Sequence, residues 1–470
     1  MPGAGERETS AAGKSPVGDE VAIAGAATGR PVQLFGRPLT MPPLKLPPLT
    51  VGVVRALAVR VAGMASALLL YVVLARSLAV AEFGIYALVL GWLNLLAMFA
   101  TAGTANTTLR FLPQYSVRGE FGLASGYLRY VMRLTLAVAL PLTALAIGFV
   151  YLRFDARTAS AAAVMLLAIP LVALIAQRQA TLRVSGSIVF ALLPEQVIRP
   201  LATVGLVCVF GLLWAPPDAL QAALALLLAT LLSYVVGLRL LARVPLPWSG
   251  AAPVYDRPVW LRATIQLGMF SWLYALLRQQ DLLLVGALLD AKSAAHYAVA
   301  LRCADIALFV PLAMDVLVTP LVSERHAQGD RMALALLVRR SARLAPLLTL
   351  PVAFALAAIS PWLLPLFGDA YIAALSALLV LIAGQALAVC TGYGAYLLTM
   401  TGHERVALWI LLAAIGVHLL LCVLLIPRFG LIGAALACSA GSLIWRLGAA
   451  FAAWRMLGVN GLPFGPLLRN

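Results

Sequence analysis

The chain contains few charged residues: only 11% of its 470 residues are Asp, Glu, Lys or Arg. Soluble globular domains average about 25%, so the composition excludes a soluble domain. Hydrophobic residues make up 63% instead, and the mean hydropathy is +0.98. Apolar runs long enough to cross a bilayer follow one another from about Val51 to Leu457. The sequence therefore predicts a polytopic membrane protein.

The residues that usually mark an enzyme or a metal centre are also scarce. The four histidines are scattered, with neither an HExxH motif nor a His/carboxylate cluster. The five cysteines lie in predicted spans without metal-ligand spacing, so we interpret them as packing residues. No nucleotide-binding fingerprint is visible. We expect a protein that is not an enzyme and that needs no metal or cofactor.

Long connections between the spans are lacking as well. The predicted outer connections, such as residues 77–83, 153–158 and 360–370, are short. Membrane glycosyltransferases, polymerases and ligases need a soluble domain or a long outer loop to hold their catalytic residues, so these classes are excluded. A channel is expected to repeat a selectivity element, and none is visible. Movement of a substrate across the membrane is the function that remains.

What the chain does contain is about twelve membrane-length apolar segments. They lie near residues 54–76, 84–108, 127–152, 159–182, 188–213, 219–242, 264–288, 294–320, 333–359, 371–398, 405–426 and 431–456. The second half echoes the first, since residues 81–86 (AEFGIY) correspond to 293–297 (SAAHY) and residues 182–186 to 398–402. An internal repeat of this kind is typical of transporters, in which the halves surround a pathway.

Charge predicts the orientation of these spans. The formal net charge is +16, and most Lys and Arg fall on one side of the membrane. Only Arg76, Arg153, Arg157, Lys292 and Arg428 fall on the other. Because the positive-inside rule explains this bias, we predict a multi-pass protein of a bacterial cytoplasmic membrane with both termini inside, and no nucleic-acid partner. Residues 1–50 show no signal peptide and are Pro-rich, so a disordered cytoplasmic tail is expected there.

Ionisable residues within the spans are the candidate functional residues, because a charge inside the bilayer is costly. We single out the arginines Arg60, Arg199, Arg278, Arg302 and Arg446 and the acids Glu195, Asp281, Asp305 and Asp315. Arg60 and Arg446 have no acid in their own helices. Since the arginine fork suits phosphate oxygens, this excess of arginine points to phosphate or pyrophosphate groups, or to acidic sugars.

Spacing predicts ion pairs among these charges. Asp281 and Arg302 lie equally far from the turn near Lys292, and so do Arg278 and Asp305, which predicts two pairs between neighbouring helices. They form either a structural clamp or a clamp that also touches substrate.

A local pair is predicted between Glu195 and Arg199, which are four residues apart between Pro194 and Pro200. This segment is either a satisfied pair or a gate, since proline bends helices. Protonation of Glu195, Asp281 or Asp305 is a candidate for coupling transport to an ion gradient.

Several stretches resemble the bacterial polysaccharide transporter family, the O-antigen and exopolysaccharide flippases of the multidrug/oligosaccharidyl-lipid/polysaccharide exporter superfamily. They are residues 74–78, 82–86, 110–115, 119–120 and 280–286, followed by Tyr297, Pro320 and residues 329–330. The resemblance covers roughly residues 52–460. It implies two six-helix lobes, 51–243 and 263–457, around a central cavity, with a cytoplasmic linker at 244–262 and a cytoplasmic tail at 458–470.

The resemblance also implies a function. The cargo would be a polyprenyl-pyrophosphate-linked oligosaccharide, moved to the outer leaflet by alternating access and driven by a proton or sodium gradient. Glycan polymerase and co-polymerase proteins would be partners. Two alternatives stay open. A multidrug or cation exporter of the same superfamily would be expected to place acids at its centre, and a membrane scaffold of a glycan-assembly complex would dock through the Pro-rich tail.

Overall fold

The computed structural model describes residues 51–213, 217–314, 318, 322, 331–400 and 403–458. All regular structure in these ranges is helical, as expected for apolar segments that must satisfy their backbone hydrogen bonds inside a bilayer. The predictions that fall on Asp315, Pro320, residues 329–330, Gly402, the N-terminal tail and most of the C-terminal tail lie outside the described residues.

The first half of the chain contains α1 (Val51–Ser77), α2 (Val80–Ala100), α3 (Thr104–Arg118), α4 (Phe121–Arg153), α5 (Ala156–Leu166), α6 (Ile169–Val184), α7 (Ile188–Leu193), the π-helical turn η1 (Pro194–Ile198), α8 (Arg199–Leu213) and α9 (Ala219–Ala242). The second half contains α10 (Arg257–Leu288), α11 (Ala291–Ala304), the 3-10 turn η2 (Asp305–Leu308), α13 (Arg331–Leu363), the 3-10 turns η3 (Leu364–Leu366) and η4 (Asp369–Ala374), α14 (Leu375–Val389), α15 (Gly394–Met400) and α16 (Glu404–Leu457).

Ten helical stretches in the described ranges are long and apolar enough to cross a membrane. The last of them, α16, is broken at Gly430, where a φ of 56° interrupts the helix, so it supplies two spans. Helix α10 has 32 residues but is more polar, because residues 278–281 (RQQD) interrupt its apolar sequence. Counting α10 and both arms of α16 gives twelve membrane-length helices in this part of the chain, which confirms the predicted all-α polytopic fold.

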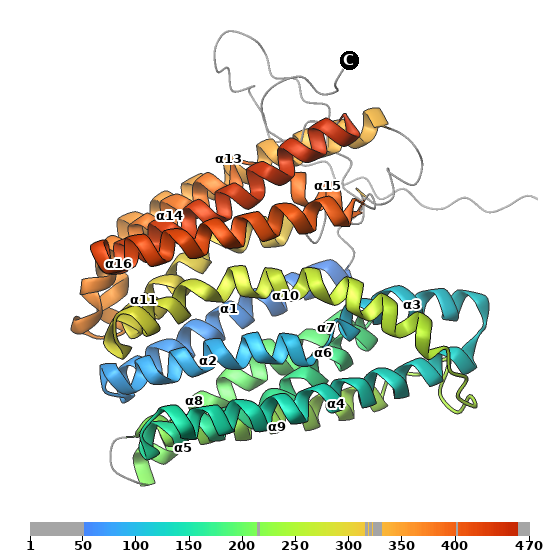
Figure 1. Ribbon diagram of the computed structural model, residues 1–470, viewed down its shortest axis with the longest axis horizontal. Helices are drawn as coiled ribbons and strands as arrows, with labels where there is room; N and C mark the ends of the chain where they lie inside the picture. Colours follow the sequence, from blue (N-terminus) through green and yellow to red (C-terminus); the bar gives the residue numbers. More distant parts are fainter. Residues whose placement is uncertain are drawn as a thin grey trace, which may run out of the picture. The chain divides into compact units, whose positions relative to one another are not determined.

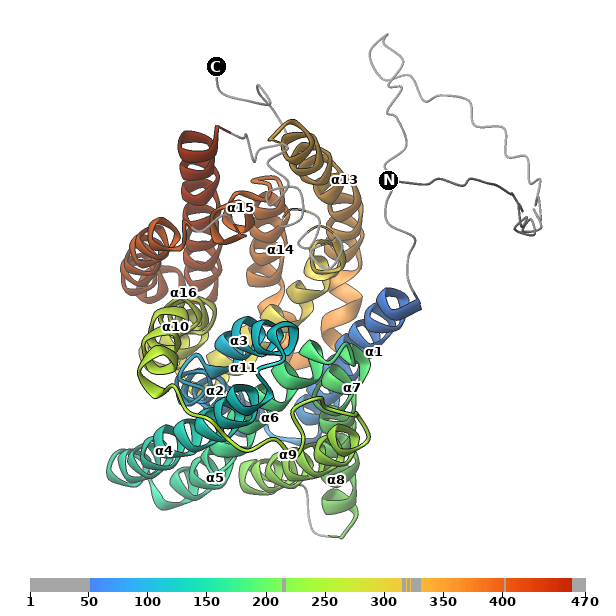
Figure 2. The same ribbon diagram turned by 90° about the vertical axis from the view of Figure 1, so that its right-hand side faces the viewer.

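Figure 1 shows α1, α2, α10 and α11 between α4–α9 on one side and α13–α16 on the other, and Figure 2 shows the same arrangement along the bundle. Helix α2 packs against both α10 and α11, which brings the two halves together. Gly84 of α2 lies so close to the carbonyl of Ala291 that no side chain would fit there. The repeated segments 81–86 and 293–297 lie in the first turns of these two helices, α2 and α11.

Aspartate side chains start three helices. Asp155, Asp218 and Asp290 accept hydrogen bonds from the backbone N–H groups of Thr158, Gln221 and Ser293, at 3.0, 3.0 and 2.6 Å. These bonds satisfy N–H groups that have no partner within the helix.

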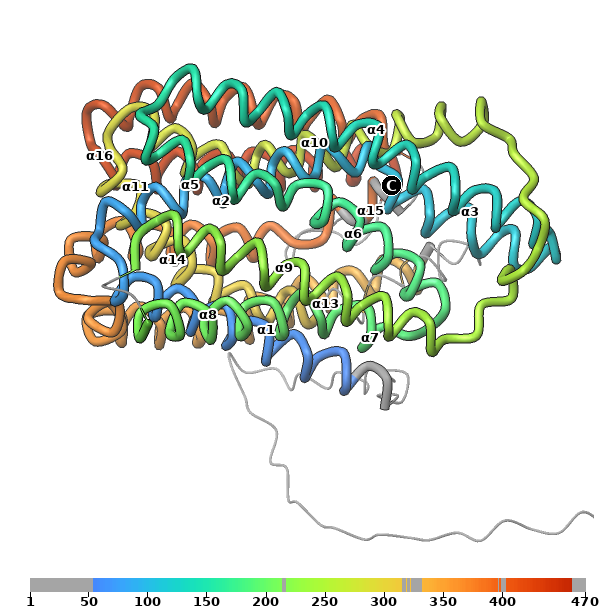
Figure 3. Tube along the Cα trace, turned by 90° about the horizontal axis from the view of Figure 1, so that it is seen from below, coloured from blue at the N-terminus to red at the C-terminus, as the bar shows by residue number. Residues whose placement is uncertain are grey.

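The helices α5, α9 and α11 that these aspartates cap all begin at the end of the bundle where α1 ends, as the tube in Figure 3 shows. At that end Arg76 of α1 donates hydrogen bonds to the carbonyls of Leu366 and Pro365 from the second half, at 2.6 and 3.2 Å. Hydrogen bonds from charged side chains thus stabilise this end of the bundle.

The connection between the halves, residues 243–256, contains no helix. The backbone N–H of Val254 donates to the carbonyl of Gly122 at 2.9 Å, so this connection lies along the start of α4. Helix α10 begins at Arg257, within the predicted linker 244–262. The division into lobes at 51–243 and 263–457 stays a prediction.

Candidate substrate cavity

Two cavities open onto the central helices. The first, of 340 Å³, is lined by α1, α2, η1, α8 and α9 and by α11 and the residues after it; we call it the N-side cavity. The second, of 320 Å³, is lined mainly by α2, α10, α11, α14 and α16; we call it the C-side cavity. Both are bordered by Tyr71, Asn94, Arg302 and Asp305, so the cavities meet along these residues.

All eight residues of the predicted site that the structure describes border one cavity or both. The N-side cavity contains Arg60, Glu195 and Arg199, the C-side cavity contains Arg278, Asp281 and Arg446, and Arg302 and Asp305 border both. The lining thus contains five arginines and three acids, an excess of positive charge. A charged residue in a membrane helix lowers its energetic cost by facing water, which explains why the charged residues within the apolar spans border the cavities.

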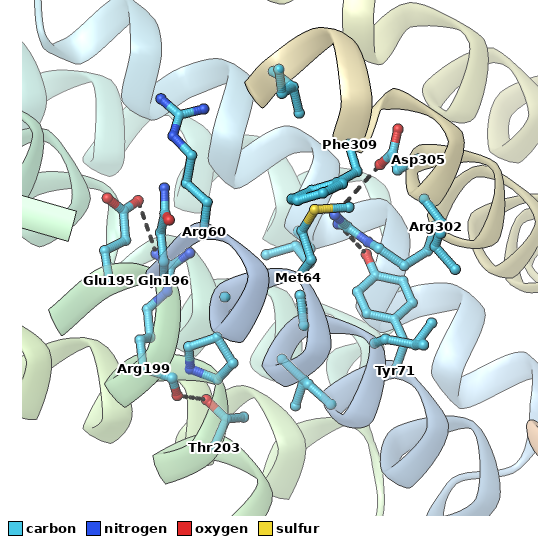
Figure 4. Close-up of a pocket in the computed structure, with 18 of the residues that line it drawn as sticks. Arg60, Met64, Tyr71, Glu195, Gln196, Arg199, Thr203, Arg302, Asp305 and Phe309 are labelled. Atoms are coloured by element: carbon cyan, nitrogen blue, oxygen red, sulfur yellow. Dashed lines mark hydrogen bonds and ion pairs between the residues drawn. The ribbon is translucent and has the colours of Figure 1, made fainter. Parts of the chain in front are cut away.

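Arg302 marks the junction of the cavities. Its guanidinium carbon lies 4.6 Å from the centre of the Tyr71 ring, and its Nη2 donates to the Tyr71 hydroxyl at 3.2 Å. Its Nη1 is 3.6 Å from a carboxylate oxygen of Asp305, three residues later, where η2 begins. Since Tyr71 belongs to α1 and Arg302 to α11, this contact joins the two halves of the chain (Figure 4).

One of the two predicted pairs between α10 and α11 is confirmed and the other is wrong. Arg278 lies 3.7 Å from Asp305, as predicted. Asp281 does not pair with Arg302, because Arg302 turns towards Tyr71 and Asp305. Asp281 is instead 1% exposed and accepts a hydrogen bond from the Tyr297 hydroxyl at 2.9 Å. Equal depth in two helices did not predict the direction in which each side chain points.

The pair between Glu195 and Arg199 is confirmed, at 3.9 Å, and Gln179 of α6 also donates to the Glu195 carboxylate. The bend expected between Pro194 and Pro200 is a π-turn, in which the N–H of Arg199 donates to the carbonyl of Pro194, five residues earlier. Single π-turns inside α-helices occur often at functional sites.

Arg60 and Arg446 have no carboxylate within salt-bridge distance among the residues described. The Nε of Arg60 is buried and has no hydrogen-bond partner among the residues that the structure describes. Figure 4 places Arg60 on the side of the N-side cavity that carries Glu195 and Gln196, across from Arg302. These two arginines are the positive charges in the lining that protein acids leave unneutralised.

The uncharged lining differs between the cavities. Besides the shared Asn94, the C-side cavity carries amides, hydroxyls and aromatic rings, namely Gln279, Gln385, Ser439, Ser442, Tyr274 and Trp445. The N-side cavity is mainly apolar apart from its charges, with Leu57, Met64, Leu68, Phe309 and Leu312. One compartment therefore offers groups that bind hydroxyl-rich ligands, and the other offers arginines beside an apolar wall.

Three residues that interact with the predicted site charges were not singled out from the sequence. Arg178, which interacts electrostatically with Glu195, lies in the predicted span 159–182, so its charge was itself the available signal. Gln179 is 8% exposed and binds Glu195, but a lone amide in a span has no distinctive pattern. Tyr71 carries no signal either, because its importance comes from Arg302 in the other half of the chain.

Comparison with known families adds to this geometry. A family model described as polysaccharide biosynthesis protein matches residues 50–324, and the MatE family model matches residues 268–424. A comparison with curated protein sequences finds no match.

Among solved structures, the chain is similar to the inward-facing form of a multidrug resistance MATE family transporter of the MOP superfamily, with a TM-score of 0.64 and 15% identity over 85% of this chain and 98% of that one. The outward-facing form of a MATE family transporter gives 0.67 and 15% identity, over 86% and 95%. A MOP superfamily transporter from Pyrococcus furiosus, described by the reverse polarity of its binding pocket, gives 0.63 and 14%, over 86% and 94%. These likenesses confirm the predicted two-lobe helical transporter fold.

Proposed function

This chain belongs to the polysaccharide biosynthesis protein family, whose model matches more than half of it, and we propose that it is a flippase for a polyprenyl-pyrophosphate-linked oligosaccharide. At the coarser level it is a membrane exporter of the MOP superfamily. The observation that carries the proposal is the charge of the cavities, where five arginines face three acids. An anionic group of the cargo supplies the negative charge that this lining lacks.

The N-side cavity suits the pyrophosphate. Arg60 and Arg199 border it together with an apolar wall that includes Met64 and Phe309. The planar guanidinium donates two parallel hydrogen bonds to phosphate oxygens. The apolar wall would accept the first isoprene units, while the rest of the lipid stays in the bilayer.

The C-side cavity suits the sugar. Asn94, Gln385 and Ser442 offer donors and acceptors for hydroxyl groups, and Trp445 offers an aromatic face. Arg446 and Arg278 would bind acidic substituents of the sugar or the distal phosphate. The glycan and the pyrophosphate would then lie on opposite sides of the contact between Arg302 and Tyr71.

Transport in this proposal proceeds by alternating access, from the cytoplasmic to the outer leaflet, with both termini in the cytoplasm. Polymerase and co-polymerase proteins would then use the product. Of the three lining acids, Asp281 alone has no arginine within salt-bridge distance in the described ranges. We therefore propose Asp281, rather than Glu195 or Asp305, as the acid that exchanges a proton during the cycle.

Multidrug export is the second candidate, favoured by the MatE match over residues 268–424 and by the fold of multidrug transporters. A cationic drug would be repelled by a lining with excess arginine, because like charges in a poorly hydrated cavity repel strongly. The charge of the cavities therefore favours the anionic cargo.

A binding measurement tests the proposal. The purified chain in lipid nanodiscs is titrated with undecaprenyl pyrophosphate and, separately, with undecaprenol, which has the same tail and no charge. The proposal predicts tighter binding of the pyrophosphate and weakening of that binding with added salt. Equal affinity for the two lipids, or preferential binding of a lipophilic cation such as ethidium, would contradict it.

A further inference from the structure

Among the arginines that the structure describes, Arg178 of α6 is the most deeply buried, with 4% exposed. Its Nη1 donates to the carbonyl of Ser233 on α9 at 3.3 Å. Its Nε and Nη2 have no hydrogen-bond partner within the described ranges. The guanidinium fills the space beside Gly237, where a methyl group would overlap Nη1. A buried cation with a single long hydrogen bond is destabilising, so a nearby anion would stabilise Arg178.

Glu195 acts electrostatically on this cation without forming an ion pair with it in this structure. Its Oε2 accepts from Gln179, the residue next to Arg178 in α6. Its Oε1 lies 3.9 Å from Arg199, at the long limit of an ion pair. Glu195 thus has three arginines within electrostatic reach, Arg178, Arg183 and Arg199, and pairs, at long range, with Arg199. Of the other two, Arg183 already donates to the amide oxygen of Gln179 at 3.4 Å, whereas Arg178 has no side-chain partner in the described ranges.

The backbone that carries Glu195 is able to reorient it. The π-turn η1 holds one residue more per turn than an α-helix, and its bond from Arg199 N–H to Pro194 closes it. Shifting such a turn by one residue rotates the side chains in it by about 100° around the helix axis. Pro194 and Pro200 lack N–H groups, so the hydrogen-bond ladder is already interrupted on both sides of Glu195.

We propose that Glu195 is a carboxylate switch that pairs with Arg199 in the absence of substrate and with Arg178 when substrate occupies Arg199. The identity of the triggering anion, a pyrophosphate, rests on the proposed function. Arg178 is then a positioning residue: it does not touch the cargo, but it receives Glu195 and so frees Arg199 for the cargo. The π-turn is the hinge of the exchange.

A measurement without ligand tests the pairing. The melting temperature of the purified chain is compared for Arg178→Met alone, Arg199→Met alone and the double variant. The switch predicts that Arg178→Met lowers the melting temperature much more when Arg199 is absent, because Glu195 then depends on Arg178. Adding Glu195→Gln should remove that extra loss. An equal loss from Arg178→Met in both backgrounds would mean that Arg178 only fills the space beside Gly237, and would overturn the switch.

Ligand binding tests the exchange itself. Arg178→Met should weaken binding of undecaprenyl pyrophosphate by about tenfold, because Glu195 then stays on Arg199 and competes with the ligand. In a Glu195→Gln background, Arg178→Met should have no effect. If it weakens binding equally in both backgrounds, Arg178 does not act through Glu195 and the switch is wrong. A wild-type chain that does not prefer undecaprenyl pyrophosphate over undecaprenol overturns the proposed function, and the melting series still decides the pairing.

Discussion

Single residues join the two halves of the chain, and the clearest case is Arg302 over Tyr71. Replacing Tyr71 with Phe keeps the ring under the guanidinium and removes the hydroxyl that accepts from Nη2. We expect this variant to lose about 1 kcal/mol of stability, and Tyr71→Leu to lose more because the cation–π contact also disappears. Thermal unfolding measures both, with Tyr151→Phe, at a tyrosine 56% exposed, as the control. Equal losses for the Phe and Leu variants would contradict this account of the contact.

Arg446 tests the role of unneutralised charge. Arg446→Ala should weaken binding of undecaprenyl pyrophosphate-linked oligosaccharide by about tenfold, as expected for loss of a charge-assisted hydrogen bond of 1.5–3 kcal/mol. Arg446→Lys should keep part of the affinity, because the charge remains and the fork is lost. Arg428→Ala, at an exposed arginine of α16 before its break at Gly430, is the control. Unchanged affinity in Arg446→Ala would place the cargo away from the C-side cavity.

Single residues also show how much of the site the sequence could predict. The charges within apolar spans border the two cavities, because water is the cheapest surrounding for them; their binding of substrate stays a prediction. Their partners were predicted only in part: Arg278 pairs with Asp305, but Arg302 binds Tyr71 rather than Asp281. The partner of each charge depends on how its helix is rotated and on side chains from distant parts of the sequence. The spacing of residues within one helix contains neither.

Among the helices, α11 offers a test of its cap. Asp290 accepts the N–H of Ser293, and this hydrogen bond holds the pKa of the carboxyl below its usual value of 3.8. A depressed folded-state pKa contributes stability above the unfolded value and loses it as the pH falls through the folded value. Asp290→Asn should therefore keep the cap and make unfolding less acid-sensitive below pH 3.8.

Asp290→Ala should cost about 1 kcal/mol at neutral pH, because the first turn of α11 loses its cap. Melting curves at neutral and acid pH compare the two variants with the parent chain. If Asp290→Asn were as unstable at neutral pH as Asp290→Ala, the side chain would not be capping α11.

Alanine substitutions at two helical glycines should change the stability of the chain in opposite directions. Gly237→Ala on α9 should cost about 1–3 kcal/mol, since the methyl displaces the guanidinium of Arg178. Gly205→Ala on α8 meets open space and should stabilise the helix by about 0.5–1 kcal/mol. Melting temperatures of the two variants should therefore move in opposite directions. Similar shifts in both would mean that Arg178 readily leaves its place beside Gly237.

Helices were more predictable than their irregularities. Long apolar runs predicted the spans because a bilayer requires a continuous apolar helix. The polar run at residues 278–281 did not prevent α10 from forming, since its neighbours cover one side of it and a cavity the other. The prolines predicted a bend at Glu195 but not its π geometry. In that turn Gln196 packs against Gly63 of α1, a contact between distant parts of the sequence that local spacing does not contain.

For the whole molecule, the internal repeat predicted two halves around a pathway. The repeated segments begin α2 and α11, and these helices pack together beside both cavities. The repeat did not indicate that the cavities differ in their uncharged lining, because that difference lies in positions the two halves do not share. The two chemistries are what a cargo with a charged lipid end and a hydroxyl-rich end requires.

The central claim is that this chain moves a lipid-linked oligosaccharide, and deletion of its gene tests that claim most directly. Polyprenyl-linked intermediates are extracted from the deletion strain and identified by mass spectrometry, while surface glycan and sensitivity to cationic drugs are measured in parallel. The account predicts loss of one surface glycan, accumulation of its complete lipid-linked repeat unit and unchanged drug sensitivity. Intact surface glycan with increased drug sensitivity would contradict the account and identify a multidrug exporter.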